Sequence, residues 1–328
     1  MSDILNQLRN LAVSRFEVVL QSNSEAVLPA LIGSTLRGAF GHALKAISCS
    51  VPHRDCERCF LSEVCLYPTI FEPTSTSKMK DLPRPFVFEP PIPPLTREIS
   101  ENQILKLRVA ENGKISFGLV LIGEAEKKLP YFVYAFELMA RHGLGANRRS
   151  FSIAEVFHLD TGNRKNLIYK PGLLKVLPFR GTNLAELIEE RLRRITTIRK
   201  LKIQLQTPLR IRRKNRELLE KINFGEILKQ CSLRLKFLSE NYGVRLEYDY
   251  QILMKNAEAV ETISDKMWKH GFFRRSNRQD KTFELDGMLG DIDFQSDDFS
   301  EFLPFISAGE FLHIGSASSL GLGKYKFA

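Results

Sequence analysis

The chain has 328 residues, with 48 Lys or Arg against 38 Asp or Glu, and its formal net charge is +10. This length accommodates two ordinary domains, and the excess of basic residues indicates a polyanionic partner such as nucleic acid. No stretch approaches the length of a transmembrane span, and the first ten residues lack the apolar core of a signal peptide. We therefore expect a cytoplasmic protein without a membrane partner.

The first half of the chain is predicted to alternate between strands and helices. Residues 15–22 are expected to form a strand, and residues 33–47 a helix that begins with Ser34 as its N-cap. Six prolines in residues 82–95 exclude a central strand and favour an extended edge or connector. The remaining predicted elements are a hairpin of residues 103–110 and 115–123, a helix of residues 129–145 with a glycine stop, and a helix of residues 183–195 that closes the first domain.

The second half is predicted to repeat this order of elements. The expected elements are a strand at 201–212, a helix at 223–243 with Cys231 in the core, a helix at 257–270, a basic loop at 273–281, two short strands about a glycine turn within 282–294, a helix at 298–313 and a last strand at 324–327. This order is typical of a ferredoxin-like domain. We predict an α+β fold of two tandem ferredoxin-like (RRM-like) domains, residues 1–196 with a cysteine-cluster insertion and residues 197–328 ending in a glycine-rich loop.

A basic segment extends from Arg191 to Arg216, with eleven Lys or Arg and no acidic residue. Within it, the strand at 201–212 alternates strictly, so that one face is apolar and the other polar. The polar face consists of Lys202, Gln204, Gln206, Arg210 and Arg212. A solvated charged face is the alternative, but such a face normally mixes both signs. We interpret this strand as part of a nucleic-acid surface.

The predicted helix "GSTLRGAFGHALKAI" (33–47) carries two interior glycines beside basic side chains. Each glycine costs about 1 kcal/mol relative to alanine in a helix interior. At 100° per residue, one face gathers Arg37, Gly38, Gly41, His42 and Lys45. Either this face packs closely on another element, or a ligand approaches it. Imidazole transfers protons near neutral pH and a cation stabilises a charged phosphorane, so His42 and Lys45 suit RNA cleavage by a 2′-hydroxyl without a metal.

Four of the five cysteines lie close together in "CSVPHRDCERCFLSEVC", at Cys49, Cys56, Cys59 and Cys65. In a reducing compartment, four such thiols indicate a metal rather than disulfides. Zinc is the default, an iron–sulfur cluster is the alternative, and His53 is a possible replacement ligand. Four sulfurs leave no open position for water, so the predicted role is structural, with no cofactor for catalysis.

The segment "HIGSASSLGLGKYKF" (313–327) spaces glycines around a lysine near the C-terminus. It is not a P-loop, because Ser318 and Tyr325 stand where that motif needs Gly and Ser or Thr. A dinucleotide fingerprint is also excluded, because only Ala328 follows the segment. Gly321 and Gly323 serve either a tight turn or a phosphate-binding nest of backbone N–H groups.

Together, these motifs resemble the CRISPR-associated endoribonucleases of the RAMP superfamily that process precursor crRNA. The resemblance is carried by "PALIGSTLRGAFGHALK", the cysteine cluster, "YPTIFEP", "GLGANRRSFSIAEV", "LQTPLRI", "RRSNRQDKTFELDGMLGDIDF" and "GEFLHIG…GLGKYKF", in this order along nearly the whole chain. It is closest to a branch with an N-terminal four-cysteine cluster. Ser316 is a departure, since a basic residue commonly follows the His-x-Gly step in this family.

The resemblance implies binding of CRISPR repeat RNA and metal-independent cleavage of precursor crRNA that leaves a 2′,3′-cyclic phosphate. It places a catalytic histidine in the first helix, at His42, with Lys45 beside it. The expected RNA contacts are Arg37, Arg210, Arg212, Arg274, Arg275, Gly321, Gly323 and Lys324. His313, next to the glycine-rich loop, competes with His42 for the catalytic role.

Two other functions remain open at this stage. One is a non-catalytic RAMP subunit that binds crRNA within a CRISPR effector complex, where the same folds and basic faces serve. The other is a zinc-containing regulator that binds duplex DNA, although no recognition helix in the sequence suits it.

Overall fold

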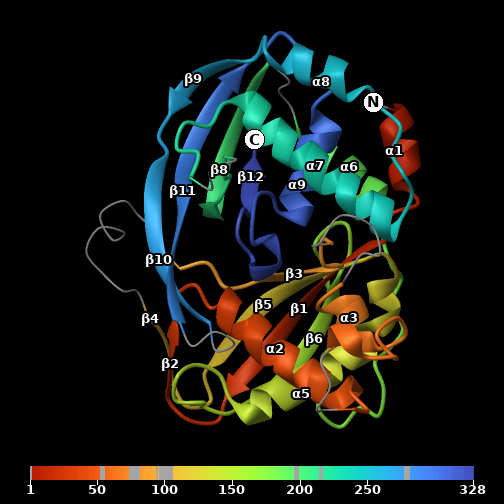
Figure 1. The fold of residues 1–328 in the computed structure, drawn as a ribbon, viewed down its shortest axis with the longest axis vertical. Coiled ribbons are helices and arrows are strands. Elements are labelled where there is room, and N and C mark those ends of the chain that lie inside the picture. Colours follow the sequence, from red (N-terminus) through yellow and green to blue (C-terminus); the bar gives the residue numbers. More distant parts are fainter. Residues whose placement is uncertain are drawn as a thin grey trace.

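The structure is a computed structural model that describes residues 2–51, 56–73, 82–93, 95, 106–195, 199–213, 217–276 and 281–328. Within these ranges, the side chains of Ser2, Glu57 and residues 272–276 and 281–285 are not described. The chain folds into two halves, each built on an antiparallel sheet (Figure 1).

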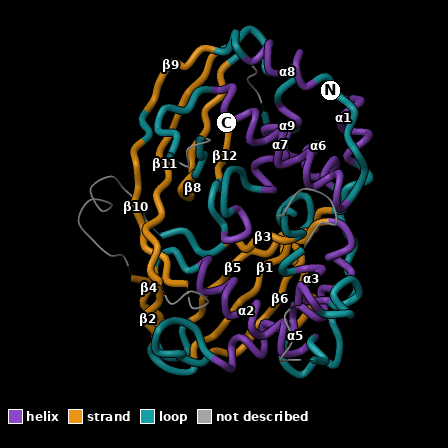
Figure 2. Tube along the Cα trace, in the orientation of Figure 1, coloured by secondary structure: helices purple, strands orange, loops and turns teal. Residues whose placement is uncertain are grey.

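The sheet of the first half has the strand order β3-β5-β1-β6-β7. Its strands are β1 (Val13–Ser22), β3 (Phe86–Glu89), β5 (Lys114–Ile122), β6 (Phe151–Leu159) and β7 (Lys165–Tyr169). Helices α2 (Gly33–Ser48) and α5 (Leu129–His142) pack beside it (Figure 2). Phe40 of α2 stacks on Phe132 of α5, with ring centroids 5.0 Å apart, over Phe86 and Phe88 of β3. The aromatic side chains thus join the helices to the sheet.

The sheet of the second half has the order β10-β11-β8-β12, and β9 also pairs with β11. Its elements are β8 (Lys200–Leu209), α7 (Phe224–Tyr242), α8 (Tyr250–Ala257), β9 (Glu261–Asp265), β10 (Trp268–Ser276), β11 (Lys281–Gln295), α9 (Leu303–Leu312) and β12 (Tyr325–Phe327). In the first half, β1 and β5 are central, and β3 and β6 flank them. In the second half, β8 and β11 are central, and β10 and β12 flank them. The predicted tandem ferredoxin-like fold is confirmed.

Several predicted elements agree with the structure because their end signals are local. Asn223 caps α7 by accepting a hydrogen bond from the Glu226 N–H, and Gly143 ends α5 with φ 87°. Cys231 is a buried core residue, as predicted. Ser34 is not the N-cap of α2, however, because that helix begins after Ile32 without a side-chain cap.

Several predicted elements are wrong. The basic loop predicted at 273–281 is one of them, because residues 273–276 belong to β10 and Lys281 begins β11. The segment 257–270 is not a helix, because α8 ends at Ala257 and the β-branched segment that follows enters the sheet as β9. The segment 282–294 is one long strand rather than two, with a bulge at Gly290 (φ 110°) instead of a turn. The hairpin at 103–123 does not form, because β4 (Lys106–Val109) pairs with β2 (Ala26–Pro29) in a separate ribbon.

The remaining elements connect the two halves. Helices α1 (Ser2–Leu8) and α6 (Leu184–Leu192) share a hydrophobic cluster with α7 and α9 of the second half. Arg191 of α6 pairs with Glu310 of α9 at 2.7 Å. The helix that was predicted to close the first domain therefore packs against the second. The short elements are α3 (Leu66–Ile70) and the 3₁₀ turns η1 (Cys56–Arg58), η2 (Gly123–Lys128) and η3 (Ser318–Leu320).

Candidate active site

One row of side chains on α2 packs against the segment of α3. Gly41 is buried, and a Cβ at this position would overlap the ring of Phe71. The Arg37 guanidinium lies 4.7 Å from the centroid of the same ring, and Lys45 Nζ lies 5.4 Å from the Tyr67 ring. Close packing therefore explains Gly41, and two of the predicted cations lie over aromatic rings.

The adjacent row of α2 is open. Gly38 and His42 are exposed, and a Cβ on Gly38 would have no neighbour within 4 Å. Of the two alternatives that the sequence left for this face, close packing applies to Arg37, Gly41 and Lys45, whereas Gly38 and His42 are open. Packing with α3 does not explain Gly38, because nothing in the described part of the chain approaches it.

The two rows of α2 predict opposite effects for the same substitution. Gly41→Ala is expected to destabilise the protein by about 1–3 kcal/mol, because its methyl group overlaps Phe71. Gly38→Ala is expected to stabilise it by about 0.5–1 kcal/mol, because alanine favours the helix and nothing crowds the position. Urea denaturation of both variants measures the difference. A stabilised Gly38→Ala variant that loses RNA affinity would indicate that RNA approaches this row closely, whereas a destabilised variant would contradict the open geometry.

His313, the competing histidine, is fully buried at the C-terminal end of α9. Its Nε2 lies 3.1 Å from Oε1 of Glu89, and its Nδ1 is buried without a hydrogen-bond partner in the described part of the chain. Burial lowers the pKa of His313, although Glu89 opposes this shift. Protonation of the neutral His313 ring would place a second proton on Nδ1, which has no hydrogen-bond acceptor in the described part of the chain. In this arrangement His313 has no access to a bound RNA.

The glycine-rich loop uses its backbone N–H groups within the protein. The N–H of Gly321 donates to Ser318 O at 2.9 Å, and that of Gly323 donates to Pro208 O at 3.1 Å. Both glycines are buried with positive φ, 89° and 70° respectively. Tight packing accounts for both glycines, and their predicted contacts with phosphate stay a prediction. Lys324 Nζ pairs with Glu89 Oε1 at 2.8 Å.

The basic face of β8 is largely neutralised by acidic residues of β11. Arg210 is buried, and its Nε donates to Asp286 O at 2.6 Å. Lys202 pairs with Asp291 at 2.7 Å, and Arg212, which is exposed, lies 3.9 Å from Asp286. The carboxylate and carbonyl that hold Arg210 belong to a neighbouring strand far away in sequence. The RNA contact of Arg210 stays a prediction.

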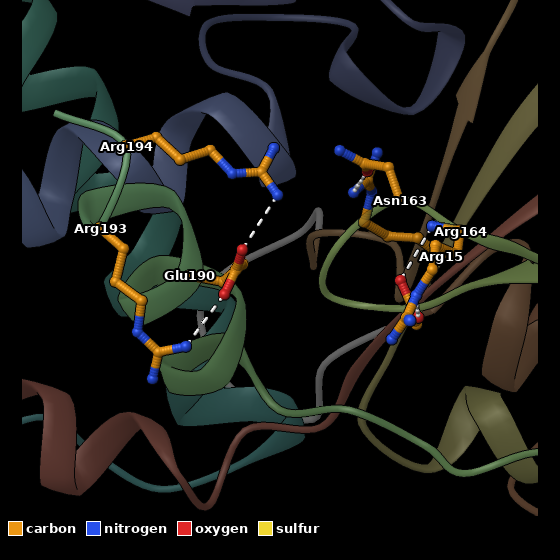
Figure 3. Close-up of polar contacts among 7 residues, drawn as sticks. Arg15, Asn163, Arg164, Glu190, Arg193 and Arg194 are labelled. Carbon is orange, nitrogen blue, oxygen red and sulfur yellow. Dashed lines mark hydrogen bonds and ion pairs between the residues drawn. The ribbon is translucent and has the colours of Figure 1, made fainter.

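Two arginines near the start of the basic segment, Arg193 and Arg194, pair with an acidic residue that precedes the segment. Glu190 accepts from Arg193 at 3.0 Å and from Arg194 at 2.9 Å (Figure 3). Nearby on the first half, Arg15 donates to Asn163 (Figure 3). The absence of acidic residues within the segment therefore does not leave all of its charge free for a polyanion. Arg274 and Arg275 lie in β10, and their side chains are outside the described part of the chain.

Glu89 is the residue that sequence reasoning missed. It lies in the proline-rich segment 82–95, which was interpreted only as an edge, and it indeed ends the edge strand β3. Burial alone raises its pKa, but the charge of Lys324 and the bond to His313 outweigh this and hold the pKa well below the usual range. Its only sequence signal is that it is the single acidic residue in that segment.

The four clustered cysteines are half-buried around the end of α2 and the start of α3. Cys65 Sγ lies 3.8 Å from Ser48 O, and burial raises the pKa of the Cys56 thiol against the opposing effect of Lys45. Four thiols are a donor set that zinc favours. However, in the part of the chain that the structure describes, no three His, Cys, Asp or Glu side chains are arranged to hold a metal ion. His53 is outside this part. The zinc site stays a prediction.

Elemental analysis tests the metal directly. We expect about one zinc per chain, or the visible absorbance of an iron–sulfur cluster in protein purified without oxygen. Cys56→Ser is then expected to lower the stability of the first half more than it lowers the cleavage rate per folded molecule. Cys231→Ser, in the core of the second half, is a control that leaves the metal content unchanged. Metal-free protein of normal stability would contradict the prediction.

Each half of the chain matches a known family model. Residues 11–179, just over half of the chain, match the family model described as the AF_1859_N N-terminal domain, and residues 203–325 match that of the CRISPR-associated endoribonuclease Cas6. The chain belongs to the AF_1859_N family, and its residues 203–325 are similar to the Cas6 family. The similarity to Cas6 supports crRNA-processing endoribonuclease activity in general terms. No helix in the described ranges is long and apolar enough to cross a membrane.

One curated relative and two solved structures are similar to the chain over nearly its whole length. An uncharacterized protein of Archaeoglobus fulgidus is 22% identical over 301 residues, covering 91% of this chain and 92% of its own. Thermus thermophilus Cas6 has a TM-score of 0.55 at 12% identity, covering 97% of this chain and 99% of that one. A Cas6 product complex has a TM-score of 0.54 at 14% identity, covering 96% and 100%. These structural matches show a shared fold.

Proposed function

We propose that this protein is a metal-independent endoribonuclease of the four-cysteine branch, which binds CRISPR repeat RNA and cleaves precursor crRNA. The observation that carries the proposal is His42, an exposed imidazole beside an open glycine on α2, in a chain whose residues 203–325 match the Cas6 family model. The runner-up is a non-catalytic subunit that binds crRNA in an effector complex.

The proposed reaction is an internal transesterification. The 2′-oxygen forms a bond to the adjacent phosphorus while the bond from phosphorus to the 5′-oxygen breaks, which leaves a 2′,3′-cyclic phosphate. The 2′-hydroxyl proton goes to a base and the leaving 5′-oxygen takes one from an acid. His42 performs one of these two transfers, for which an imidazole is well suited near neutral pH.

The surroundings of His42 support this role over His313. Gly38 lies one helical turn before it and leaves room for an RNA backbone, whereas the His313 ring is sealed in the interior. Lys45, three residues after His42, is held near Tyr67. We propose that Lys45 contributes less to the transition state than His42, as a longer-range positive charge.

Incubation of the purified protein with the repeat RNA of its own genome, in EDTA, tests the function. We expect cleavage to persist and the product to end in a 2′,3′-cyclic phosphate. A substrate with a 2′-deoxy nucleotide at the cut site is expected to be inert, because the nucleophile is missing. Binding without cleavage would favour the non-catalytic subunit, and preferential binding of duplex DNA would favour the regulator.

The two arginines at the end of the β8 segment are expected to differ in their effect on RNA binding. Arg212→Gln should weaken binding and reduce the slope of log K against log salt by about one, because Arg212 is exposed. Arg210→Gln should instead destabilise the fold by about 1–3 kcal/mol, because it removes the buried guanidinium and its hydrogen bond to Asp286 O. Titrations at several salt concentrations measure the slope. Lys229→Gln, on the exposed side of α7, is the control, and an unchanged slope for Arg212→Gln would remove this residue from the interface.

A further inference from the structure

A buried carboxylate joins the two halves of the molecule. Oε1 of Glu89, in the first half, accepts from Lys324 Nζ at 2.8 Å and from His313 Nε2 at 3.1 Å, both in the second half. The Glu89 side chain is only 10% exposed and that of His313 is fully buried. A carboxylate so placed is stable only because two donors from the other half complete its environment.

The first half leaves space for this carboxylate. Gly118 of β5 lies directly opposite Glu89 in the strand register. A Cβ on Gly118 would lie 2.5 Å from Oε2 and 2.9 Å from the Cβ of Glu89. The position has no positive φ that would require glycine, so the approach of the Glu89 side chain accounts for it.

The second half adopts a strained backbone to reach it. His313 has φ 57° and ψ 151°, a region that non-glycine residues rarely occupy. The turn is held on both sides, because Ile314 N–H donates to Gly323 O at 3.2 Å and Arg234 Nε donates to Leu312 O at 3.2 Å. Strain of this kind persists only where the surrounding structure enforces it, and here it directs the His313 ring to Glu89.

The loop beside this ion cluster rests on α2. A Cβ at Gly33, the first residue of α2, would overlap Leu320 O of η3, and one at Gly321 would lie 2.7 Å from Phe88 O of β3. The loop preceding β12 lies against β3, between the two halves (Figure 1). Helix α2, which carries His42, therefore begins where it contacts the glycine-rich loop, and Glu89 stabilises the position of this loop.

We propose that Glu89 is a positioning residue for RNA cleavage. Shared by Lys324 and His313, its carboxylate holds the glycine-rich loop on β3 and on the start of α2. It thereby fixes His42 relative to RNA bound by the second half. Two charge-assisted hydrogen bonds specify one docking geometry more strictly than apolar contacts do. This inference rests on the proposed endoribonuclease function.

Glu89→Gln tests the proposal, because glutamine keeps the shape of the side chain and removes its charge. We expect the single-turnover rate at saturating RNA to fall at least about tenfold per folded molecule, because small misplacements of catalytic groups cost this much or more. The Kd for repeat RNA should change less than about twofold, since Glu89 does not touch RNA. Hydrogen exchange of the amides in residues 313–324 should become faster.

A double variant and a control separate positioning from simple stability. Glu89→Gln with Lys324→Gln removes the unpaired buried charge and should recover stability but not the cleavage rate. Glu17→Gln breaks a pair with Lys165 within the same sheet (2.7 Å) and should leave the rate unchanged. An inactive wild-type protein would contradict the proposed function. An active wild type whose folded Glu89→Gln and double variants keep its rate would overturn the positioning role alone.

Discussion

His42→Ala is expected to lower the single-turnover cleavage rate by about 100-fold or more while RNA binding stays near the wild-type level. In the proposed reaction the exposed imidazole transfers a proton, and its removal is expected to leave the contacts with phosphate in place. The rate should be measured at saturating RNA, so that Kd does not enter. His42→Gln, which keeps a polar side chain without the titrating group, is expected to be similarly slow.

Two further histidine and lysine variants complete this experiment. Lys45→Ala is expected to cost less than His42→Ala, because the Lys45 ammonium lies over Tyr67, outside the open row. His313→Ala is expected to act through stability and loop position, because its ring is buried against Glu89. If His313→Ala abolished cleavage in a folded protein while His42→Ala left it intact, the active site would belong to the second half and the assignment of His42 would be wrong.

The parts of the fold that were predictable depend on neighbouring residues in sequence. Alternation along β8 is observed from Leu201 to Gln206, with the apolar residues buried and the polar ones facing outward. Capping by Asn223 and the glycine stop at Gly143 likewise need only a few adjacent residues. Such signals fix the type of an element and one of its ends, and the two repeats of this order were enough to predict the fold.

The errors arise where distant segments determine the environment of a residue. Gly287 and Gly290 suggested a turn, but Gly287 gives room to Pro208 of β8 and to Arg210 just after it, and Gly290 forms a bulge beside Trp268. The charge of Arg210 is compensated by Asp286, which is 76 residues away. Neither of these contacts can be predicted from the local periodicity of the sequence.

At the candidate site, too, the errors arise where distant segments of the chain meet. A helical projection placed Gly38 and Gly41 on one face, but it contained no information on where α3 would pack. Phe71, thirty residues after Gly41 in the chain, covers one of the two rows and leaves the other open. Glu89 escaped notice because its partners, His313 and Lys324, lie more than two hundred residues further along.

Gly323→Ala is expected to be among the most destabilising single methyl additions to this protein, by about 3–5 kcal/mol. Its φ of 70° is unfavourable for alanine, and the new Cβ would overlap the backbone carbonyl of Ile314. That carbonyl belongs to the turn after His313, so it has little freedom to move. Chemical denaturation measures the loss.

Gly172→Ala is the matched control for this prediction. Gly172 also has a positive φ, 91°, but it is exposed and a Cβ there would have no neighbour within 4 Å. Only the backbone preference is then lost, at about 1 kcal/mol. The difference between the two variants measures the packing of the glycine-rich loop separately from its conformation. Equal losses would mean that the loop is not tightly packed, and the phosphate-binding interpretation of Gly323 would regain its physical basis.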